Sequence, residues 1–427
     1  MSLFDIAAIL IGLSALFGYV NYRFLKFPHT IGLVVVALFA SGVIIIADSV
    51  FAAAHIATLV TDLLDRIDFN NALMNGMLSF LLFAGAVHVD IGALARRKWS
   101  ISLMATAGVL ISTFVIGTAT WFIAPGLGLE IPFIWALVFG ALISPTDPVA
   151  VLGILKTVTI PRSLQAKIAG ESLFNDGVGV VVFAIIVAIA LGAGDGGHGN
   201  IGMVEIARLF AWEAIVGAIF GFVMGYIAYL AMRVIDEHNI EVLITLALVM
   251  VTYSISIHLH ISGPIAVVIA GLLIGNHGAK FAMSENTRQH VFQFWELIDE
   301  ILNSVLFLLI GLEVLVVGRN IEFLPIAIAA IPAVLMARWV AVAIPISLLS
   351  IRARFTPGAI RILTWGGLRG GISVALALSL PPAPQKPAIV AMTYAVVVFS
   401  IIVQGLTMKP LVNLLVKPDT APLPQEH

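Results

Sequence analysis

Residues 170–177 read GESLFNDG and open an apolar segment that continues through residues 178–191. This stretch places carboxylates inside a helix that would cross a lipid bilayer, where each charge costs roughly several kcal/mol. An ionisable side chain at that depth indicates an ion or proton pathway. Ser172, Asn175 and Asp176 share one helix face, whereas Glu171 points roughly 140° away from Asp176, at about 100° per residue. We expect Asp176 to bind a transported ion and Glu171 to have a structural partner.

The composition is that of an integral membrane protein. Of the 427 residues, 60% are hydrophobic and 11% are charged, whereas soluble domains carry about 25% charged residues. The chain has no cysteine, which excludes disulfides, thiol catalysis and cysteine-bound metal ions. The net charge of −2 gives no indication of a nucleic-acid partner. Residues 1–21 lack a basic leading region, so we interpret them as a first transmembrane helix rather than a signal peptide.

Apolar runs separated by polar residues, proline or glycine predict an all-α membrane protein with about thirteen spans. We place the spans at 3–21, 29–48, 71–93, 99–124, 131–155, 165–192, 204–232, 240–258, 261–276, 295–318, 323–350, 357–380 and 387–414. The weakest division is the one between the eighth and ninth spans, which only residues 258–262 separate. In the tenth span, Glu296 and Glu300 are interpreted as interfacial charges at a helix start.

The distribution of positive charge provides an independent test of this topology. When the loops are assigned alternately to the two sides of the membrane, one set contains 16 lysines and arginines and the other contains 4. Loops rich in lysine and arginine face the cytoplasm. The asymmetry therefore predicts an odd number of spans, with the amino terminus outside and the carboxyl terminus in the cytoplasm.

Two of the predicted spans contain residues that interrupt a helix. Residues 144–148 read SPTDP, and residues 365–371 read WGGLRGG. Prolines and glycines loosen or end helices, and interrupted helices at matching positions of two halves indicate the midplane site of a transporter. The breaks fall in the fifth and twelfth spans, an odd offset that predicts inverted halves with two crossed discontinuous helices. We expect a single transporter unit over 1–427, with halves at 1–192 and 240–416, a linking span within 193–239 and a short cytoplasmic tail at 417–427.

Five charged side chains are predicted to lie at membrane depth: Asp147, Glu171, Asp176, Arg338 and Arg369. Three acids and two bases leave one carboxylate uncompensated, which either a proton or a monovalent cation can neutralise in turn. Alkali cations prefer oxygen ligands. Asp176, Asp147 and Ser172 offer side-chain oxygens, and the backbone at Thr146 offers a carbonyl. Because Asn175 is neutral where a second carboxylate would take a second proton, we expect electroneutral 1:1 exchange.

Three motifs together are specific for one family. The segments SPTDPV (144–149), GESLFNDG (170–177) and WGGLRG (365–370) resemble the monovalent cation:proton antiporters of the NhaP type, bacterial relatives of the sodium/proton exchangers. Residues 80–94, 262–276 and 294–313 are also similar to that family, so the resemblance covers nearly the whole chain.

The resemblance implies roles for individual residues. It places the ion on Asp176 with Asp147, Ser172 and the Thr146 backbone nearby, and the pair Asn175–Asp176 is typical of the electroneutral branch. It pairs Glu171 with an arginine of a later helix, for which Arg338 matches, and it assigns Arg369 to the second broken helix. It further implies a homodimer in a bacterial inner membrane, bound to lipid, that exchanges protons for Na⁺ or Li⁺ without a cofactor.

Several alternatives remain open at this point. Asp147 could serve only as a helix cap, Glu171 could pair with either arginine, and Arg369 could hold helix ends together or tune Asp176. A K⁺/H⁺ antiporter would have the same architecture, because cation choice depends on ligand geometry that spacing does not resolve. A channel is less favoured because a continuous polar stripe is missing from the predicted helices. An enzyme is not favoured because the sequence shows no nucleophile–base pair or metal triad.

Overall fold

Every regular element in the described part of the chain is a helix. The computed structural model describes residues 3–50, 77–92, 98–147, 162–192, 203–317, 321–350 and 358–415, and these ranges contain no strand. Backbone N–H and C=O groups find no water inside a bilayer, so a spanning chain must satisfy them within helices or a closed barrel. The predicted all-α class is confirmed for these residues.

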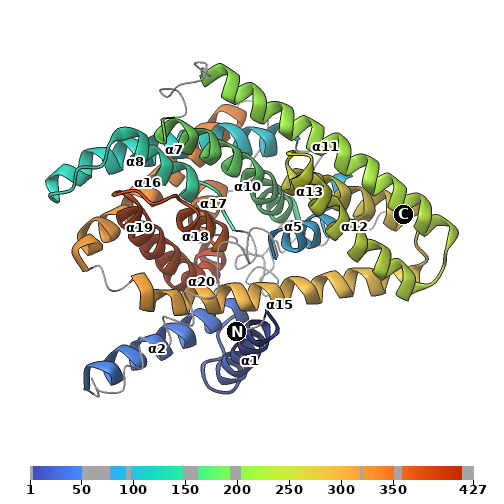
Figure 1. Cartoon of the computed structure of the whole chain (residues 1–427), viewed down its shortest axis with the longest axis horizontal. Coiled ribbons are helices and arrows are strands. Elements are labelled where there is room, and N and C mark those ends of the chain that lie inside the picture. Colours follow the sequence, from blue (N-terminus) through green and yellow to red (C-terminus); the bar gives the residue numbers. More distant parts are fainter. Residues whose placement is uncertain are drawn as a thin grey trace.

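The helices follow the chain in the order shown by the colours of Figure 1. The amino-terminal half contains α1 (Leu3–Val20), η1 (Asn21–Leu25), α2 (His29–Val50), α5 (Leu78–Val87), α7 (Lys98–Gly126), α8 (Phe133–Ile143) and α10 (Arg162–Ala190). The middle contains α11 (Met203–Val234), α12 (His238–His258), α13 (Gly263–Leu273), η4 (Ile274–Gly278), α14 (Ala279–Phe281) and α15 (Glu285–Val317). The remainder contains η5 (Ile321–Phe323), α16 (Leu324–Ser350), α17 (Ala359–Trp365), α18 (Gly371–Leu378), α19 (Lys386–Phe399), η6 (Ser400–Gln404) and α20 (Gly405–Leu415).

The helices have the length and apolar surface of membrane spans. Within the described residues, nine are long and apolar enough to cross a bilayer, and α5 and α8 are shorter apolar helices. Large apolar side chains face outward, such as Phe39, which is 73% exposed, and Trp212, which is 66% exposed. Exposed apolar surface of this extent indicates contact with lipid. The chain is therefore an integral, multi-pass membrane protein.

The weakest predicted division is confirmed. Helix α12 ends at His258 and α13 begins at Gly263. Ser262 caps α13, because its Oγ accepts a hydrogen bond from Ile265 N at 3.4 Å.

The predicted start of the tenth span is wrong. Helix α15 begins at Glu285, not near residue 295. Ser284 precedes this start, and its Oγ accepts a hydrogen bond from Thr287 N at 3.3 Å, as a helix cap does. The first turns of α15 are polar, so hydropathy alone does not detect them. Glu296 and Glu300 consequently lie within the helix rather than at its start.

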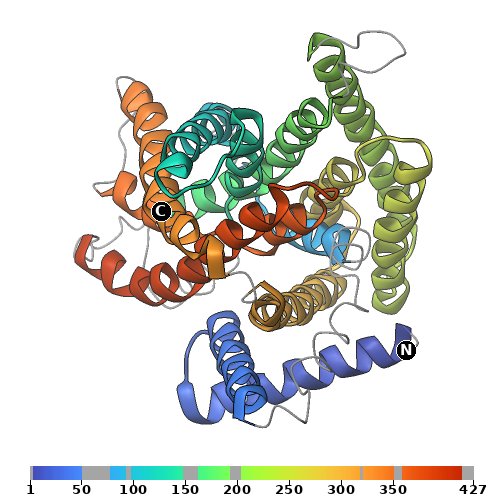
Figure 2. The same cartoon turned by 60° about the vertical axis from the view of Figure 1, so that its left-hand side comes forward.

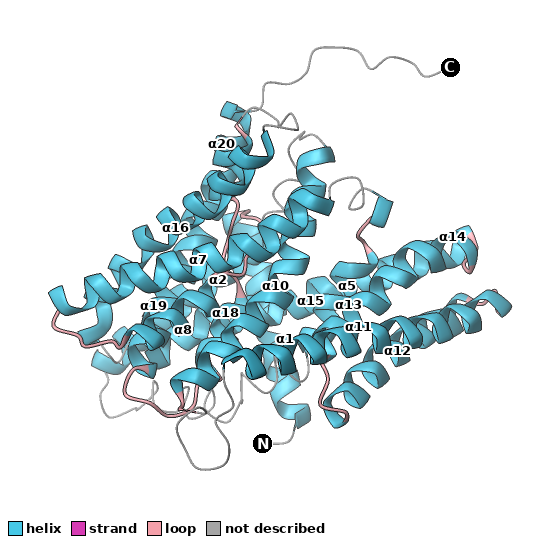
Figure 3. Ribbon diagram, turned by 90° about the horizontal axis from the view of Figure 1, so that it is seen from above, coloured by secondary structure: helices cyan, strands magenta, loops and turns pink. Residues whose placement is uncertain are grey.

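The buried apolar residues form two clusters. One joins α1, α2, α7, α8, α10, α16, α17, α18, α19, η6 and α20, and we call these helices the site bundle. The other joins α5, α11, α12 and α13, the scaffold bundle. Helices α7 and α15 contribute to both: Ile101 and Trp295 lie in the scaffold cluster, and Ile116 and Phe307 lie in the site cluster. Figure 1 shows α15 with α1 and α2 on one side and most of the other helices on the opposite side, and Figure 2 shows the same arrangement. Figure 3 shows that the regular elements of the described residues are helices.

Small residues bring the helices of the scaffold bundle close together. Gly217, Gly221 and Gly225 of α11 face Ser262, Ala266 and Ala270 at the start and along α13. A Cβ added at Gly221 would lie 2.6 Å from Ala266 Cα. Small residues at every fourth position are the usual means by which membrane helices approach one another. The scaffold bundle is therefore held by backbone-to-backbone packing.

Residues 193–202, the tail at 417–427 and the residues that follow Asp147 in the fifth span lie outside the described residues. The predicted division into inverted halves stays a prediction.

Gly221→Ala tests the close packing of α11 on α13. We expect the variant to lose about 1–3 kcal/mol of stability, because the added methyl group must force the two backbones apart. The loss is measured as a lower melting temperature of the purified protein in detergent. Gly12→Ala is the matched control, since a Cβ at Gly12 meets nothing within 4 Å. Equal melting temperatures for the two variants would contradict this account of the packing.

Candidate functional site

The first helix break follows α8. This helix ends at Ile143, and residues 144–147 continue without helical structure. Pro145 has no N–H group to donate, so the helix cannot continue through it with its bonds intact. Ser144 and Thr146 are 3% and 2% exposed. The free backbone groups of this segment therefore lie inside the protein, where they need partners.

The second break separates α17, which ends at Trp365, from α18, which begins at Gly371. The intervening residues Gly366–Gly370 carry Arg369, which is 1% exposed. Glycine at most of these positions allows an extended backbone with little steric hindrance. This break is the one predicted in the twelfth span.

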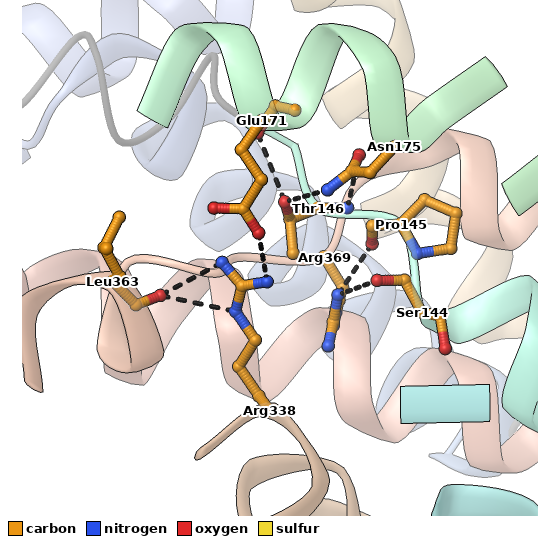
Figure 4. Close-up of polar contacts among 9 residues, drawn as sticks. Ser144, Pro145, Thr146, Glu171, Asn175, Arg338, Leu363 and Arg369 are labelled. Carbon is orange, nitrogen blue, oxygen red and sulfur yellow. Dashed lines mark hydrogen bonds and ion pairs between the residues drawn. The ribbon is translucent and has the colours of Figure 1, made fainter. Parts of the chain in front are cut away.

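The two breaks lie against each other. Asp147 N donates to Leu368 O at 2.8 Å. Arg369 Nη1 donates to Ser144 O at 2.6 Å and to Pro145 O at 2.8 Å, as Figure 4 shows. A Cβ at Gly370 would overlap the Asp147 side chain, so glycine is needed for this approach. Each break thus supplies hydrogen-bond partners for the other.

Helix α10 presents a polar face to the first break. Asn175 Oδ1 accepts from Thr146 N at 3.3 Å, and Asn175 Nδ2 donates to Thr146 Oγ1 at 2.8 Å. The Ser172 hydroxyl lies 3.2 Å from Thr146 Oγ1. Ser172 and Asn175 are therefore on one side of α10, as their spacing predicted, and together they hold Thr146 in place.

Asp176 lies on the same side of α10. The residue is only 9% exposed, and the charged groups that act on its carboxylate are Asp147 and Arg369. Asp147 itself is partly exposed. Asp176 therefore lies on the side of α10 whose Ser172 and Asn175 contact the first break.

Glu171 points to a different partner. Its Oε1 forms an ion pair with Arg338 Nη1, and both residues are buried. Arg338 Nε and Nη2 also donate to Leu363 O at 3.3 and 3.2 Å (Figure 4). Of the two arginines considered from the sequence, Arg338 is thus the one that pairs with Glu171. The contact joins α10, α16 and α17.

The described charged groups of this region fall into two sets. Glu171 and Arg338 neutralise each other. The almost completely buried carboxylate of Asp176 lies in the electrostatic field of Asp147 and Arg369. Buried charges are costly unless paired, so a proton or an oxygen-coordinated monovalent cation would stabilise this arrangement.

Sequence reasoning missed several groups that hold the site. The carbonyls of Ser144, Pro145 and Leu368 carry no sequence signature, because every residue has one. Ser400 and Gln404 were also missed, although they contact the second break. Their signal was present, since both are polar residues within the apolar range 387–414.

Comparisons with known proteins agree with this geometry. A family model described as "Sodium/hydrogen exchanger, transmembrane" matches residues 12–414. The chain is 49% identical over 413 residues to the Na⁺/H⁺ antiporter NhaP of Pseudomonas aeruginosa, covering 96% of both chains. It is 37% identical over 354 residues to the Na⁺/H⁺ antiporter NhaH of Halobacillus dabanensis, covering 81% of this chain and 84% of that one.

A solved structure has the same fold. The structure of the sodium proton antiporter MjNhaP1 from Methanocaldococcus jannaschii superimposes with a TM-score of 0.71 at 20% identity. The match covers 97% of this chain and 99% of the other.

Arg338→Met tests the ion pair with Glu171. We expect a loss of about 3–5 kcal/mol of stability, because the substitution leaves a buried carboxylate without its partner. The combined change Glu171→Leu and Arg338→Met should recover most of the loss, since no buried charge then remains unpaired. Thermal melting in detergent measures both.

Arg361→Met serves as the control, because Arg361 is an exposed arginine on α17. If Arg338→Met melted at the same temperature as Arg361→Met, the pair would not stabilise the fold.

Proposed function

The chain belongs to the sodium/hydrogen exchanger family, and on this basis we propose that it exchanges Na⁺ for H⁺ across the membrane with Asp176 as the ion-binding residue. One observation carries the assignment of the residue: Asp176 is a buried carboxylate on α10, and the charged groups that act on it, Asp147 and Arg369, belong to the segment after α8 and to the break between α17 and α18.

Exchange follows from competition for one carboxylate. An ionised Asp176 in a nearly dry site is unfavourable, so the site favours a state in which it holds either a proton or a cation. If the protein changes access only when the carboxylate is neutralised, each ion must leave before the other enters. This competition is sufficient to couple the two fluxes.

The proposed cation ligands are Asp176, Asp147 and Ser172 through side-chain oxygens and Thr146 through its carbonyl. These groups come from α10 and from the non-helical segment after α8, where the backbone carbonyls are not all used by a helix. Asn175 has a supporting role in this proposal, since both ends of its amide bond Thr146. Glu171 and Arg338 are assigned a structural role because they neutralise each other.

The exchange is proposed to be electroneutral, with one Na⁺ for one H⁺. Asn175 is an amide next to Asp176, so a second carboxylate is not available at that position for a second proton. Two relatives that match most of this chain bear the name Na⁺/H⁺ antiporter, which favours Na⁺ over the K⁺ alternative. Li⁺ is a further candidate for the same oxygen ligands.

The wider arrangement is also part of the proposal. Transport would proceed by movement of the site bundle against the scaffold bundle, in a homodimer within a bacterial inner membrane. The amino terminus would lie outside and the carboxyl terminus in the cytoplasm, with inverted halves at 1–192 and 240–416. The separation of the buried apolar residues into two clusters supports two bodies that can move relative to each other.

Asp176→Asn tests the ion site. The purified protein is reconstituted in liposomes with an internal pH dye and an imposed pH gradient, and Na⁺, Li⁺ or K⁺ is added in turn. We expect Na⁺-driven proton movement in the wild type and none in Asp176→Asn, because the neutral amide has no negative charge to bind either a proton or a cation. Glu130→Gln, at an exposed acid between α7 and α8, should exchange normally. Normal exchange by a folded Asp176→Asn protein would refute the assignment.

The stoichiometry has a separate test. In the same liposomes, valinomycin and K⁺ gradients set the membrane potential to inside-negative, zero or inside-positive values. We expect equal initial rates of Na⁺-driven proton movement in all three states, because one-for-one exchange moves no net charge. Rates that depend on the sign of the potential would require unequal numbers of ions.

A further inference from the structure

The apolar span 386–415 contains a local change of helix type. Helix α19 ends at Phe399, residues Ser400–Gln404 form the π-helix η6, and α20 follows. Gly405 N donates to Ser400 O, five residues earlier, as π geometry requires. Single π turns within α-helices are rare and occur frequently at functional sites. Here the turn presents two buried polar side chains, Ser400 at 1% and Gln404 at 3% exposure.

Both side chains contact the second helix break. Ser400 Oγ accepts a hydrogen bond from Arg369 N at 3.1 Å and donates to Gln404 Oε1 at 2.5 Å. Gln404 Nε2 in turn donates to Trp365 O at 3.0 Å. The donor and acceptor of each bond are fixed by the backbone groups involved. Arg369 N–H can only donate, and the Trp365 carbonyl can only accept.

We call the three hydrogen bonds from Arg369 N through Ser400 and Gln404 to Trp365 O the relay. The two backbone groups that the relay joins would have bonded each other in a continuous helix. An α-helix pairs each N–H with the carbonyl four residues earlier, so Arg369 N would donate to Trp365 O. The break separates the two groups, and the side chains of Ser400 and Gln404 bridge them. Trp365 has a second anchor in the same span, since its Nε1 donates to Thr407 Oγ1 at 2.9 Å.

The relay determines where Arg369 lies. The backbone of Arg369 is held by Ser400, and its guanidinium reaches Ser144 O and Pro145 O of the first break. The neighbouring Leu368 O accepts from Asp147 N. Displacement of Arg369 would therefore be transmitted to the segment that carries Thr146 and Asp147.

A cavity of about the size of one water molecule lies beside Arg369. It is lined by Arg338, Gly367, Arg369, Ser400 and Gln404. Arg369 Nε and Nη2 have no hydrogen-bond partner among the described residues. The guanidinium is thus held from its backbone and through Nη1, while its other donors lie beside a cavity.

We infer that Ser400 and Gln404 are positioning residues for ion exchange: they replace the backbone hydrogen bond lost at the second break and so hold Arg369 against the first break. Their described hydrogen bonds go to the second break and to each other. The inference rests on the proposed function, because it assigns to them an effect on cation binding at Asp176.

Ser400→Ala and Gln404→Leu test the relay in the liposome exchange assay. We expect each to raise the half-saturating Na⁺ concentration by about threefold to tenfold, the effect of one lost hydrogen bond. The pH profile should move to higher pH, because a proton competes more effectively when the cation ligands are less well placed. Maximal rates should change little, whereas melting temperatures should fall moderately, because buried polar groups lose their hydrogen-bond partners. Ser400→Thr keeps the hydroxyl and should remain close to the wild type.

Thr393→Val is the matched control. Thr393 is fully buried on the neighbouring helix α19, and its hydroxyl donates only to Ile389 O of its own helix among the described contacts. If Ser400→Ala and Gln404→Leu reconstitute and match Thr393→Val in half-saturating Na⁺ concentration and pH profile, the inference is wrong. Lower yields with unchanged Na⁺ dependence would also overturn it, because the residues would then be structural only.

Ser400→Cys takes the place of Ser400→Ala if the latter does not reconstitute, since a thiol is a weak donor and acceptor of similar size. The same shift is expected for Ser400→Cys, and an unchanged Na⁺ dependence would again show that the inference is wrong. Failure of the proposed ion site can be distinguished from failure of the relay. If the ion site is wrong, the Asp176→Asn protein is active, whatever the result for the Ser400 and Gln404 variants.

Discussion

The site depends on mutual hydrogen bonding between the segment that follows α8 and the break between α17 and α18. Inside a membrane protein, a helix break exposes backbone groups that water does not reach, and each costs several kcal/mol if left without a partner. Asp147 N bonds Leu368 O, and Arg369 bonds the carbonyls of Ser144 and Pro145. Neither break is satisfied alone. These contacts join segments that are more than 200 residues apart in the sequence.

The two buried arginines have different electrostatic roles. Arg338 neutralises Glu171 and joins three helices, so this part of the site has no charge to offer an ion. Arg369 uses one nitrogen to hold two carbonyls and acts on Asp176 only through its field.

The scaffold bundle and the site bundle differ in how they are packed and in which charged residues they contain. The scaffold bundle brings α11 and α13 together through glycine and alanine, a mode of packing that leaves few side chains to rearrange. The site bundle contains both breaks and every charged residue of the site. Helix α15 touches both and is the longest helix in the described part of the chain. Relative movement of the two bundles would therefore leave the interior of each largely intact.

The sequence by itself determined the helical class, most span positions, the two breaks and the set of charged residues, because hydropathy and the cost of charge in lipid are properties of local sequence. It also placed Ser172 and Asn175 on one face of α10, since helix periodicity is local. Only the tertiary structure decided that Glu171 pairs with Arg338, 167 residues away, and that Arg369 bonds backbone carbonyls. The roles of Ser400 and Gln404 were likewise hidden. Backbone groups are identical at every position, so their partners become visible only when distant segments are brought together in space.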